Sequence, residues 1–444
     1  MHYVVVGNSI AGIEAAIALR NRDAKARITV ISGEHDHPFA RVSLMYIFCG
    51  QLSLKDTEFY DRGLYDRMRF ERVKDWVTGV RAAEHRVELA SGRSVPYDRL
   101  LLAVGSKARR MPWPNAYEGP GVHHFVTLQD HEKLDAAAKK GMRAAVIGGG
   151  LIGVESAEVL HLRGLKTHFL IREPWYFPVA LDNNEAEVVA EHIRHHGVDA
   201  RTGTPVDSME RRGSELVLKL PEEQVTVDLV VGAIGVVPAT DFLKDGEVAL
   251  NAQSGAIETD DGLRSTTAPD VWAAGDCAQV TWPDGARRPE QIWYTSRDQG
   301  RAAARSMLGD EVVYRRGTWY NSAKFFDLEY TTAGFIPFPA KPNKPGGGEG
   351  DGGYVTWYQQ VPGTSMTQRV VCKGDRVVGF NCMGSRWDHQ VFMRWIHERR
   401  SLEWVLDHME EARFDEEFMP KFKVHPNATV VGADPPALKA ASSK

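Results

Sequence analysis

Cysteine is scarce in this chain: there are four among 444 residues, and none of them form a C-x-x-C pair. So few cysteines in so long a chain exclude a disulfide framework of the kind that holds small secreted domains together. We therefore expect a reduced, cytoplasmic protein.

Long apolar runs and an excess of positive charge are also missing. No apolar stretch approaches the roughly 18 residues needed to span a bilayer, and the N-terminus opens into a strand-like run without the basic segment of a secretory signal. The formal net charge is −5 and the pI is near 6.4, whereas a nucleic-acid surface needs a basic field. We expect neither a membrane span nor a nucleic-acid partner.

What the chain does contain is a glycine turn between a strand and a helix, within its first two dozen residues. The apolar run Tyr3–Val6 predicts a buried strand, and Ile13–Arg20 is a run of good helix formers. Between them, Gly7, Ser9 and Gly12 follow the spacing G-x-G-x-x-G. This pattern permits a tight turn, close approach of a phosphate to the backbone, and an anion site at the helix start.

A second, unaltered copy stands near the middle of the chain. Ala144–Ile147 predicts a strand, Gly148, Gly150 and Gly153 form the fingerprint, and Val154–Arg163 continues as a helix. One such fingerprint is weak evidence, because it can be a glycine turn of an ordinary α/β sheet. Two copies predict two dinucleotide sites, for two bound dinucleotides or for one cofactor and one diffusible substrate. A chain of this length is also expected to form two or three domains.

The residue after the second strand of each unit selects the nucleotide. An acid there binds ribose hydroxyls, and an arginine accommodates the 2′-phosphate of NADP. In the first unit, Glu34 is the nearest acid after Arg27–Ile31. In the second, Lys166–Ile171 is followed by Arg172 and Glu173. Arg172 favours NADPH slightly, while Glu173 keeps NADH open.

Three later segments carry a resemblance to a known family. Leu100–Arg109 resembles the A-T-G-S-x-P-R segment of the FAD-dependent pyridine nucleotide–disulfide oxidoreductase superfamily. Asp228–Pro238 is similar to the element that closes the nicotinamide domain of that superfamily, and Ala268–Ala278 resembles its second FAD motif, whose Asp holds the ribityl chain. The residues that this resemblance assigns to cofactor binding are Gly105, Arg109, Gly235, Gly275 and Asp276.

The resemblance implies an α/β fold with two Rossmann-like dinucleotide-binding domains and an α+β C-terminal domain. Trp319–Gly334 resembles the start of the C-terminal dimerisation domain of NADH oxidases and coenzyme A–disulfide reductases, so we expect a homodimer. Gln390–Met409 predicts one helix, and the tail after Pro420 is expected to be poorly ordered. The implied domain limits are 1–118 and 241–312 for the split FAD domain, 119–240 for the NAD(P) domain, and 313–444 for the C-terminal domain.

The segment expected to face the flavin departs from the cysteine-dependent branch. Where that branch carries its redox cysteine, this chain has Val42 and Ser43, and Cys49 lies further along. We therefore predict a flavin without a cysteine relay. Pro38–Leu44 instead resembles the P-Y-x-R-x-x-L of rubredoxin, ferredoxin and nitrite reductase flavoproteins, which implies that Arg41 contacts the FAD pyrophosphate.

Few other side chains are expected to take part in the chemistry. The resemblance implies that Tyr46, Glu155 and Trp293 are neighbours of the flavin or nicotinamide rings, and it implies no catalytic acid or base, because hydride passes between the two rings. The histidines of one predicted helix have no further ligand at an evident spacing, so we expect no metal site there. They are His192, His195 and His196.

Together these observations predict an FAD-dependent NAD(P)H oxidoreductase that passes hydride to FAD and electrons to a small-molecule or redox-protein acceptor. Two alternatives stay open. The chain could be the reductase of a ferredoxin- or rubredoxin-like protein, or a flavoprotein subunit or redox scaffold of a larger complex.

Overall fold

The computed structural model describes residues 1–114, 119–337, 353–414 and 421–432. The chain divides into two compact units: 1–111 with 123–138 and 234–317, and 112–122 with 139–233 and 318–444. The first unit is interrupted and resumed, as in a split domain, and the limits predicted from the sequence stay a prediction. No helix within the described ranges is both long and apolar enough to cross a bilayer.

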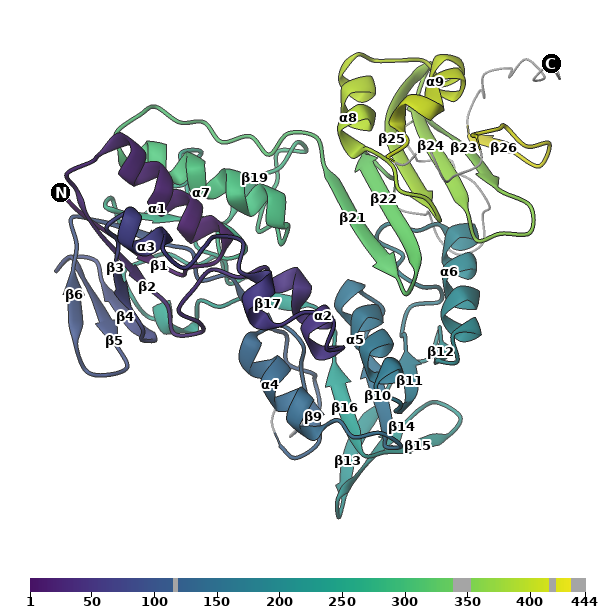
Figure 1. Ribbon diagram of the computed structural model, residues 1–444, viewed down its shortest axis with the longest axis horizontal. Helices are drawn as coiled ribbons and strands as arrows, with labels where there is room; N and C mark the ends of the chain where they lie inside the picture. The colour runs from purple at the N-terminus through teal and green to yellow at the C-terminus, as the bar shows by residue number, and fades with distance from the viewer. Residues whose placement is uncertain (115–118, 338–352, 415–420, 433–444) are drawn as a thin grey trace. The chain divides into compact units, whose positions relative to one another are not determined.

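The first unit is built on a five-stranded parallel sheet in the order β18–β7–β1–β2–β3 (Figure 1). Side chains of β1 alternate between two buried clusters: Tyr3 and Val5 pack toward helices α1 and α7, whereas Val4 and Val6 pack toward a small antiparallel sheet. Burial on both faces explains why the strand is an unbroken apolar run. The bounds are β1 (His2–Val6), β2 (Arg27–Ile31), β3 (Glu71–Val73), β7 (Arg99–Leu102), β18 (Val271–Ala273), α1 (Ile10–Arg22) and α7 (Trp293–Met307).

Smaller elements complete the first unit. The antiparallel sheet has the order β4–β5–β6, and β8 pairs antiparallel with β17, which joins the two ends of the inserted segment. The bounds are β4 (Val77–Arg81), β5 (Arg86–Leu89), β6 (Ser94–Pro96), β8 (Ser106–Ala108), β17 (Val236–Pro238), β19 (Val280–Thr281), β20 (Arg287–Arg288), α2 (Leu44–Phe48), α3 (Leu64–Arg67) and α4 (Leu128–Ala137).

The second unit contains another five-stranded sheet, in the order β12–β11–β10–β16–β9. Strand β10 pairs parallel with both β11 and β16, so the second fingerprint follows a central strand, as the first does. The bounds are β9 (Val122–His123), β10 (Arg143–Ile147), β11 (Lys166–Leu170), β12 (Asp199–Arg201), β13 (Ser208–Arg212), β14 (Glu215–Lys219), β15 (Gln224–Val227), β16 (Leu229–Gly232), α5 (Leu151–Leu162) and α6 (Asn183–His195). The predicted pair of Rossmann-like sheets is confirmed.

The C-terminal part of the second unit is a six-stranded antiparallel sheet in the order β21–β22–β25–β24–β23–β26. Its core is aromatic, and the rings of Phe380 and Phe392 stack with centroids 4.1 Å apart. The bounds are β21 (Tyr320–Phe325), β22 (Leu328–Gly334), β23 (Tyr354–Gln360), β24 (Thr367–Lys373), β25 (Arg376–Met383), β26 (Thr429–Gly432), α8 (His389–His397) and α9 (Leu402–His408).

Two local expectations are wrong. The predicted single helix over 390–409 is two helices, because Arg399 takes a φ of +57° and the Ser401 side chain accepts a hydrogen bond from Trp404 N, which starts a new helix. The tail after Pro420 is ordered where β26 pairs antiparallel with β23.

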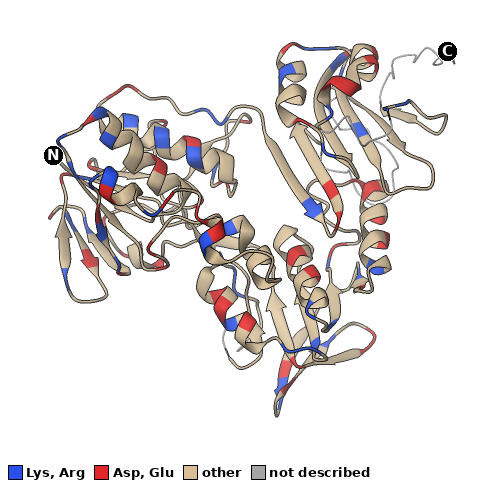
Figure 2. Ribbon diagram, viewed as in Figure 1, with Lys and Arg blue, Asp and Glu red and all other residues tan. Residues whose placement is uncertain are grey.

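Charged residues are interspersed over the elements of both units. Lysine and arginine alternate with aspartate and glutamate along helices such as α4 and α7 (Figure 2). This mixture agrees with the small net charge of −5.

Candidate dinucleotide sites

The first fingerprint forms a tight turn at the carboxyl end of β1. Gly7 has a φ of +104°, and a Cβ there would overlap the carbonyl oxygen of Ala103 at the end of β7. A Cβ on Gly12 would overlap the carbonyl oxygen of Gly7. Glycine is therefore required at both places, so that the turn and the helix start can approach each other.

The second fingerprint repeats this geometry at the end of β10. Gly148 has a φ of +120° and its N–H donates to Leu170 O at 3.0 Å. A Cβ on Gly153 would overlap Gly148 O, whereas a Cβ on Gly150 would meet no described atom within 4 Å. The turn is closed on the side of the helix and open at Gly150, which leaves room for a phosphate.

The described helices differ in whether a side chain caps their first turn; the short helices α2 and α3 lack such a cap. Helices α4, α6, α8 and α9 each have an N-cap side chain that accepts a backbone N–H. No described side chain caps α1 at Ser9, α5 at Gly150 or α7 at Ile292. First-turn N–H groups without such a cap can bind an anion, which fits a pyrophosphate at α1 and α5.

Glu34 and Arg41 form an ion pair beside the first fingerprint. Arg41 donates to both carboxylate oxygens of Glu34, at 2.7 and 2.5 Å, and to Val126 O at 2.9 Å. Leu128 N also donates to Glu34. Burial raises the pKa of Glu34, but the hydrogen bond and charge of Arg41 outweigh it and lower the pKa overall. The two residues predicted to contact different parts of FAD thus touch each other, and their contacts with FAD stay a prediction.

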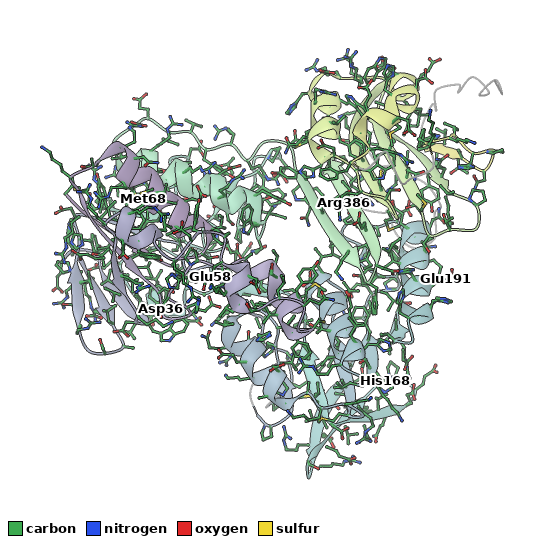
Figure 3. The ribbon with its side chains drawn as sticks, in the orientation of Figure 1. Asp36, Glu58, Met68, His168, Glu191 and Arg386 are labelled. Carbon is green, nitrogen blue, oxygen red and sulfur yellow. The ribbon has the colours of Figure 1, made fainter. Side chains whose placement is uncertain are left out.

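The loop that leads to Arg41 is held by a second carboxylate. Glu58, labelled in Figure 3, accepts from Arg62 at 2.8 Å and lies 3.4 Å from His35 Nε2. Phe39 forms an isolated antiparallel bridge with Glu58. These contacts fix the loop between β2 and the segment predicted to face the flavin.

Asp276 lies near the end of the second predicted FAD motif, Ala268–Ala278. It accepts a hydrogen bond from Ser106 Oγ at 2.6 Å and a longer one from Ser296 Oγ at 3.4 Å. Burial raises the pKa of Asp276, against the hydrogen bond from Ser106 and the charge of Arg41. The sequence did not point to Ser106, although it follows Gly105 directly in the resembling segment.

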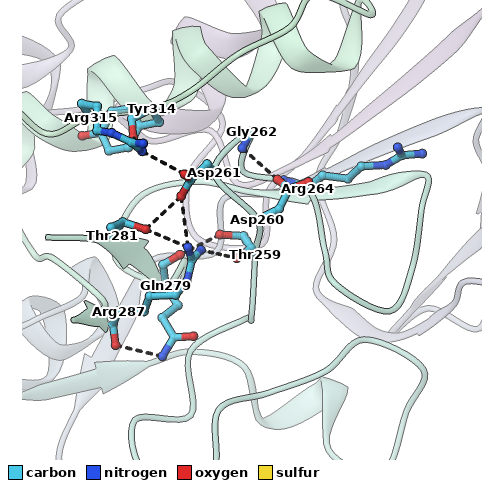
Figure 4. A network of polar contacts seen from close by, with 10 residues as sticks. All are labelled: Thr259, Asp260, Asp261, Gly262, Arg264, Gln279, Thr281, Arg287, Tyr314 and Arg315. Carbon is cyan, nitrogen blue, oxygen red and sulfur yellow. Dashed lines mark hydrogen bonds and ion pairs between the residues drawn. The ribbon is translucent and has the colours of Figure 1, made fainter. Parts of the chain in front are cut away.

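The segment around Asp276 is held by a polar network that centres on Asp261 (Figure 4). Asp261 accepts from Arg315 at 3.0 Å, from Thr281 at 2.9 Å and from Arg287 at 3.2 Å. The hydrogen bond from Arg315 is the main reason that the pKa of Asp261 is lowered. Arg287 also donates to Thr259 O. The network ties the loops on either side of β18 together.

Helix α7, which begins at the predicted ring neighbour Trp293, is fastened to this motif. Gly275 N donates to Gln299 of α7 at 2.8 Å, and a Cβ on Gly300 of α7 would overlap Ala11 O of α1. Trp293 begins α7, where its ring meets Phe59 edge-on at 6.2 Å. Helix α7 therefore starts beside Asp276 and α1, and the role of Trp293 stays a prediction. Tyr46 lies half-buried on α2, and its role stays a prediction.

The antiparallel pairing of β8 with β17 brings together two segments that were predicted to bind cofactors. Arg109 N donates to Gly235 O at 3.0 Å, and Gly105 has a φ of +68° with no described atom within 4 Å of a built Cβ. Gly235, which the sequence placed at the close of the nicotinamide domain, lies in the first unit with Gly105.

The described cysteines do not stand at the position of a relay cysteine. Val42 is 63% exposed at the position of the relay cysteine in other branches. Cys277 is fully buried, and burial raises the pKa of its thiol to about 11, so it stays protonated. It packs in the apolar core of the first unit. Cys372 and Cys382 face Val377 and Gln368, not each other.

The nucleotide-selecting position of the second unit is open to solvent. Arg172 is 79% exposed and donates to Glu173 at 2.8 Å, whereas the Glu173 side chain is 31% exposed. Both charged groups thus stand at the end of β11. The exposed guanidinium can reach a 2′-phosphate, and the carboxylate can accept a 2′-hydroxyl.

Helix α5 carries a pair of acids that the sequence revealed only in part. Burial and the charge of Glu158 raise the pKa of Glu155 to about 7, and Lys324 opposes them. Lys324 Nζ, on β21, donates to Glu158 Oε1 at 2.5 Å. Glu155 is the predicted neighbour of the nicotinamide. Glu158, three residues further on the same face, was missed although the spacing i, i+3 shows it.

Comparison with known proteins agrees with this geometry. The family model for pyridine nucleotide-disulphide oxidoreductases matches residues 1–300. Subunit epsilon of the NADH-dependent phenylglyoxylate dehydrogenase of Aromatoleum evansii is 30% identical over 345 residues, which cover 76% of this chain and 80% of that protein. A ferredoxin–NAD(P)(+) reductase of a Sphingomonas species is 27% identical over 90% of this chain and 94% of its own length.

Solved structures show the same fold. The covalent putidaredoxin reductase–putidaredoxin complex matches with a TM-score of 0.76 and 20% identity, over 90% of this chain and 93% of that one. The water-forming NADH oxidase of Lactobacillus brevis, bound to NADH, matches with a TM-score of 0.77 and 22% identity, over 95% and 94%.

Proposed function

The chain belongs to the pyridine nucleotide-disulphide oxidoreductase family, and from that premise we propose that it is the flavoprotein reductase of a small iron–sulfur redox protein. It is an FAD-dependent NAD(P)H oxidoreductase. When bound, FAD accepts a hydride from NAD(P)H and passes the electrons to the acceptor.

The observation that carries the proposal is the replacement of the relay cysteine by Val42 and Ser43. Cys277, the cysteine next to Asp276, is buried and protonated. Among the described residues, no thiolate therefore stands where electrons would leave the flavin. A disulfide substrate would need such a thiolate to exchange with. An iron–sulfur acceptor does not, because it takes single electrons without a covalent step.

The chain's own residues bind and orient the two dinucleotides. The start of α1 would hold the FAD pyrophosphate, Asp276 with Ser106 would hold the ribityl chain, and the Glu34–Arg41 pair would close the site beside them. The start of α5 would hold the nicotinamide dinucleotide, with Arg172 at its 2′ position.

The names of the relatives support the same acceptor class. Ferredoxin–NAD reductase components and a ferredoxin reductase subunit are among the similar proteins. The similarity to subunit epsilon of phenylglyoxylate dehydrogenase favours a second candidate, a flavoprotein subunit of a larger complex. A chain of this second kind would co-purify with other subunits and turn over slowly alone.

Acceptor competition tests the proposal. The purified flavoprotein is mixed with NADH or NADPH and then with a [2Fe–2S] ferredoxin, a quinone or oxygen, and nicotinamide oxidation is followed. In the ferredoxin assay, cytochrome c is added to report the electrons that leave ferredoxin. We expect reduction of cytochrome c that depends on the added ferredoxin. Equal rates with and without ferredoxin, together with fast oxygen or quinone reduction, would contradict the proposal.

Assembly and location belong to the same proposal. We place the protein in the cytoplasm, where a chain with no described disulfide would stay reduced. We expect a homodimer through the C-terminal sheet, with a solution mass near twice 49.4 kDa by light scattering.

A further inference from the structure

Two histidines of α6 meet an aspartate from a distant hairpin. His192 Nε2 lies 2.6 Å and His196 Nε2 3.1 Å from Asp327 Oδ1. One ligand atom from each of the three residues lies within 4.8 Å of the other two. Sequence spacing gave only the histidines, because Asp327 lies in the turn between β21 and β22.

The His196 ring is oriented by the helix itself. His196 Nδ1 lies 2.9 Å from His192 O, and since a carbonyl oxygen only accepts, Nδ1 carries the hydrogen. In this tautomer the neutral ring has its lone pair on Nε2, the atom that faces Asp327. A hydrogen bond from the second ring nitrogen to a carbonyl is the usual arrangement around a metal-binding histidine.

The hairpin holds its carboxylate in a strained turn. Phe326 and Asp327 are the two turn residues, and Phe326 has a φ of +61° at the first of them, where glycine is preferred. Such a conformation is unfavourable for a residue with a side chain and persists where packing enforces it. Here the Phe326 ring packs on His196 with centroids 4.9 Å apart.

We propose that His192, His196 and Asp327 bind a Zn²⁺ ion that clamps α6 to the β21–β22 hairpin. Two imidazoles and one carboxylate, with a position left for water, are a zinc donor set. Tetrahedral bonds of about 2.0–2.1 Å place ligand atoms about 3.3–3.5 Å apart. The two contacts of Asp327 Oδ1 with the histidines, at 2.6 and 3.1 Å, reach that spacing if Asp327, which is 76% exposed at a turn, withdraws by less than about 1 Å.

The zinc clamp would hold elements that follow the second fingerprint in the chain. The same hairpin carries Lys324, which pairs with Glu158 on α5. Helix α6 follows Arg172 in the chain, and Glu191, labelled on this helix in Figure 3, precedes His192 in the sequence. Zinc would therefore fix the C-terminal hairpin to helices of the nicotinamide sheet.

A zinc titration of the untagged, flavin-loaded chain tests the proposal. Zn²⁺ is added to chelator-treated protein in competition with a chromophoric chelator, and thermal melts are recorded with and without Zn²⁺. We expect one tight ion per chain and a higher Tm with zinc. His192→Ala, His196→Ala and Asp327→Asn should each weaken binding by roughly tenfold or more and abolish the Tm rise.

His195→Ala is the matched control, because His195 is exposed on the same helix and lies outside the cluster. It should bind zinc as the parent does. Asp327→Asn changes an exposed side chain, so it keeps the test valid if a histidine variant fails to fold. Absence of tight binding by the parent, or equal binding by the parent and Asp327→Asn, would overturn the proposal.

Discussion

Glu185 of α6 and Arg369 of β24 form an ion pair inside the second unit, with Oε2 and Nη2 2.7 Å apart and side chains 0% and 3% exposed. Asn381 Nδ2 also donates to both Glu185 oxygens, and Arg369 donates to Ala180 O at 2.7 Å. Burial favours the neutral form of Glu185 and raises its pKa, whereas the charge of Arg369 and the hydrogen bond from Asn381 favour the carboxylate of the ion pair. The pair joins the N-terminus of α6 to the C-terminal sheet.

Replacing Arg369 should be costly for stability. Arg369→Met leaves the Glu185 carboxylate buried without its cation, and we expect a loss of about 3–5 kcal/mol in the free energy of unfolding. Guanidinium unfolding followed by circular dichroism measures it. The double variant Glu185→Gln/Arg369→Met should recover much of the loss. Arg386→Met, which breaks an exposed pair with Glu329, is the control and should cost less than about 1 kcal/mol.

The sequence predicts what depends on local pattern and misses what depends on distant contacts. Both fingerprints, their strands and their helices follow from glycine spacing and apolar runs, because these fix the backbone locally. The four-residue strand β26 was missed, since its pairing with β23 decides it. Asp327 was missed for the same reason. It lies on a hairpin, 135 residues after His192 in the sequence, and only the folded chain brings it beside His192 and His196.

Glu155 makes stability depend on pH. Its folded-state pKa is about 7, above the reference value of 4.5. The protonated acid is therefore favoured in the folded state, and this stabilisation is complete below about pH 4.5 and lost as the pH rises through 7. Glu155→Gln should raise the free energy of unfolding by on the order of 2 kcal/mol at pH 8 and by less at pH 5.

Chemical unfolding at the two pH values checks this prediction. Glu187→Gln, an exposed acid on α6, serves as the control and should change stability little at either pH. A gain for Glu155→Gln that is the same at pH 5 and pH 8 would argue against an ionisation effect.

The carboxylate of Asp276 should govern retention of FAD. Asp276→Asn removes a charged acceptor, and such a hydrogen bond contributes about 1.5–3 kcal/mol, or about tenfold or more in the dissociation constant. Flavin absorbance of the purified protein and fluorescence on reconstitution measure it. Ser296→Ala should weaken FAD binding less than Asp276→Asn does. It removes only the longer of the two hydrogen bonds to Asp276, since Ser296 Oγ lies 3.4 Å away and Ser106 Oγ lies 2.6 Å away. An unchanged FAD affinity in Asp276→Asn would remove Asp276 from the site.

Arg172 should set the preference between the two nicotinamide nucleotides. Arg172→Glu replaces the cation by a carboxylate that repels a 2′-phosphate, so the ratio of kcat/KM for NADPH to that for NADH should fall about tenfold or more. Stopped-flow reduction with each nucleotide measures the ratio. Lys166→Glu, at the exposed start of the same strand, should leave it unchanged. If Arg172→Glu also leaves this ratio unchanged, Arg172 does not select the nucleotide and is only a solvated surface charge.

Electron counting decides whether a thiol takes part. A flavin without a cysteine relay takes up one two-electron equivalent, whereas a relay disulfide or sulfenate would take up a second. We therefore expect anaerobic titration of the flavoprotein with NADPH or dithionite to end after one equivalent per FAD, without a thiolate–flavin absorption band. Cys49→Ser should show the same end point and the same ferredoxin reduction rate, because Cys49 caps α2 seven residues beyond Val42. A second equivalent that disappears in Cys49→Ser would make that cysteine the relay, since Cys277, with a thiol pKa of about 11, holds its proton at neutral pH.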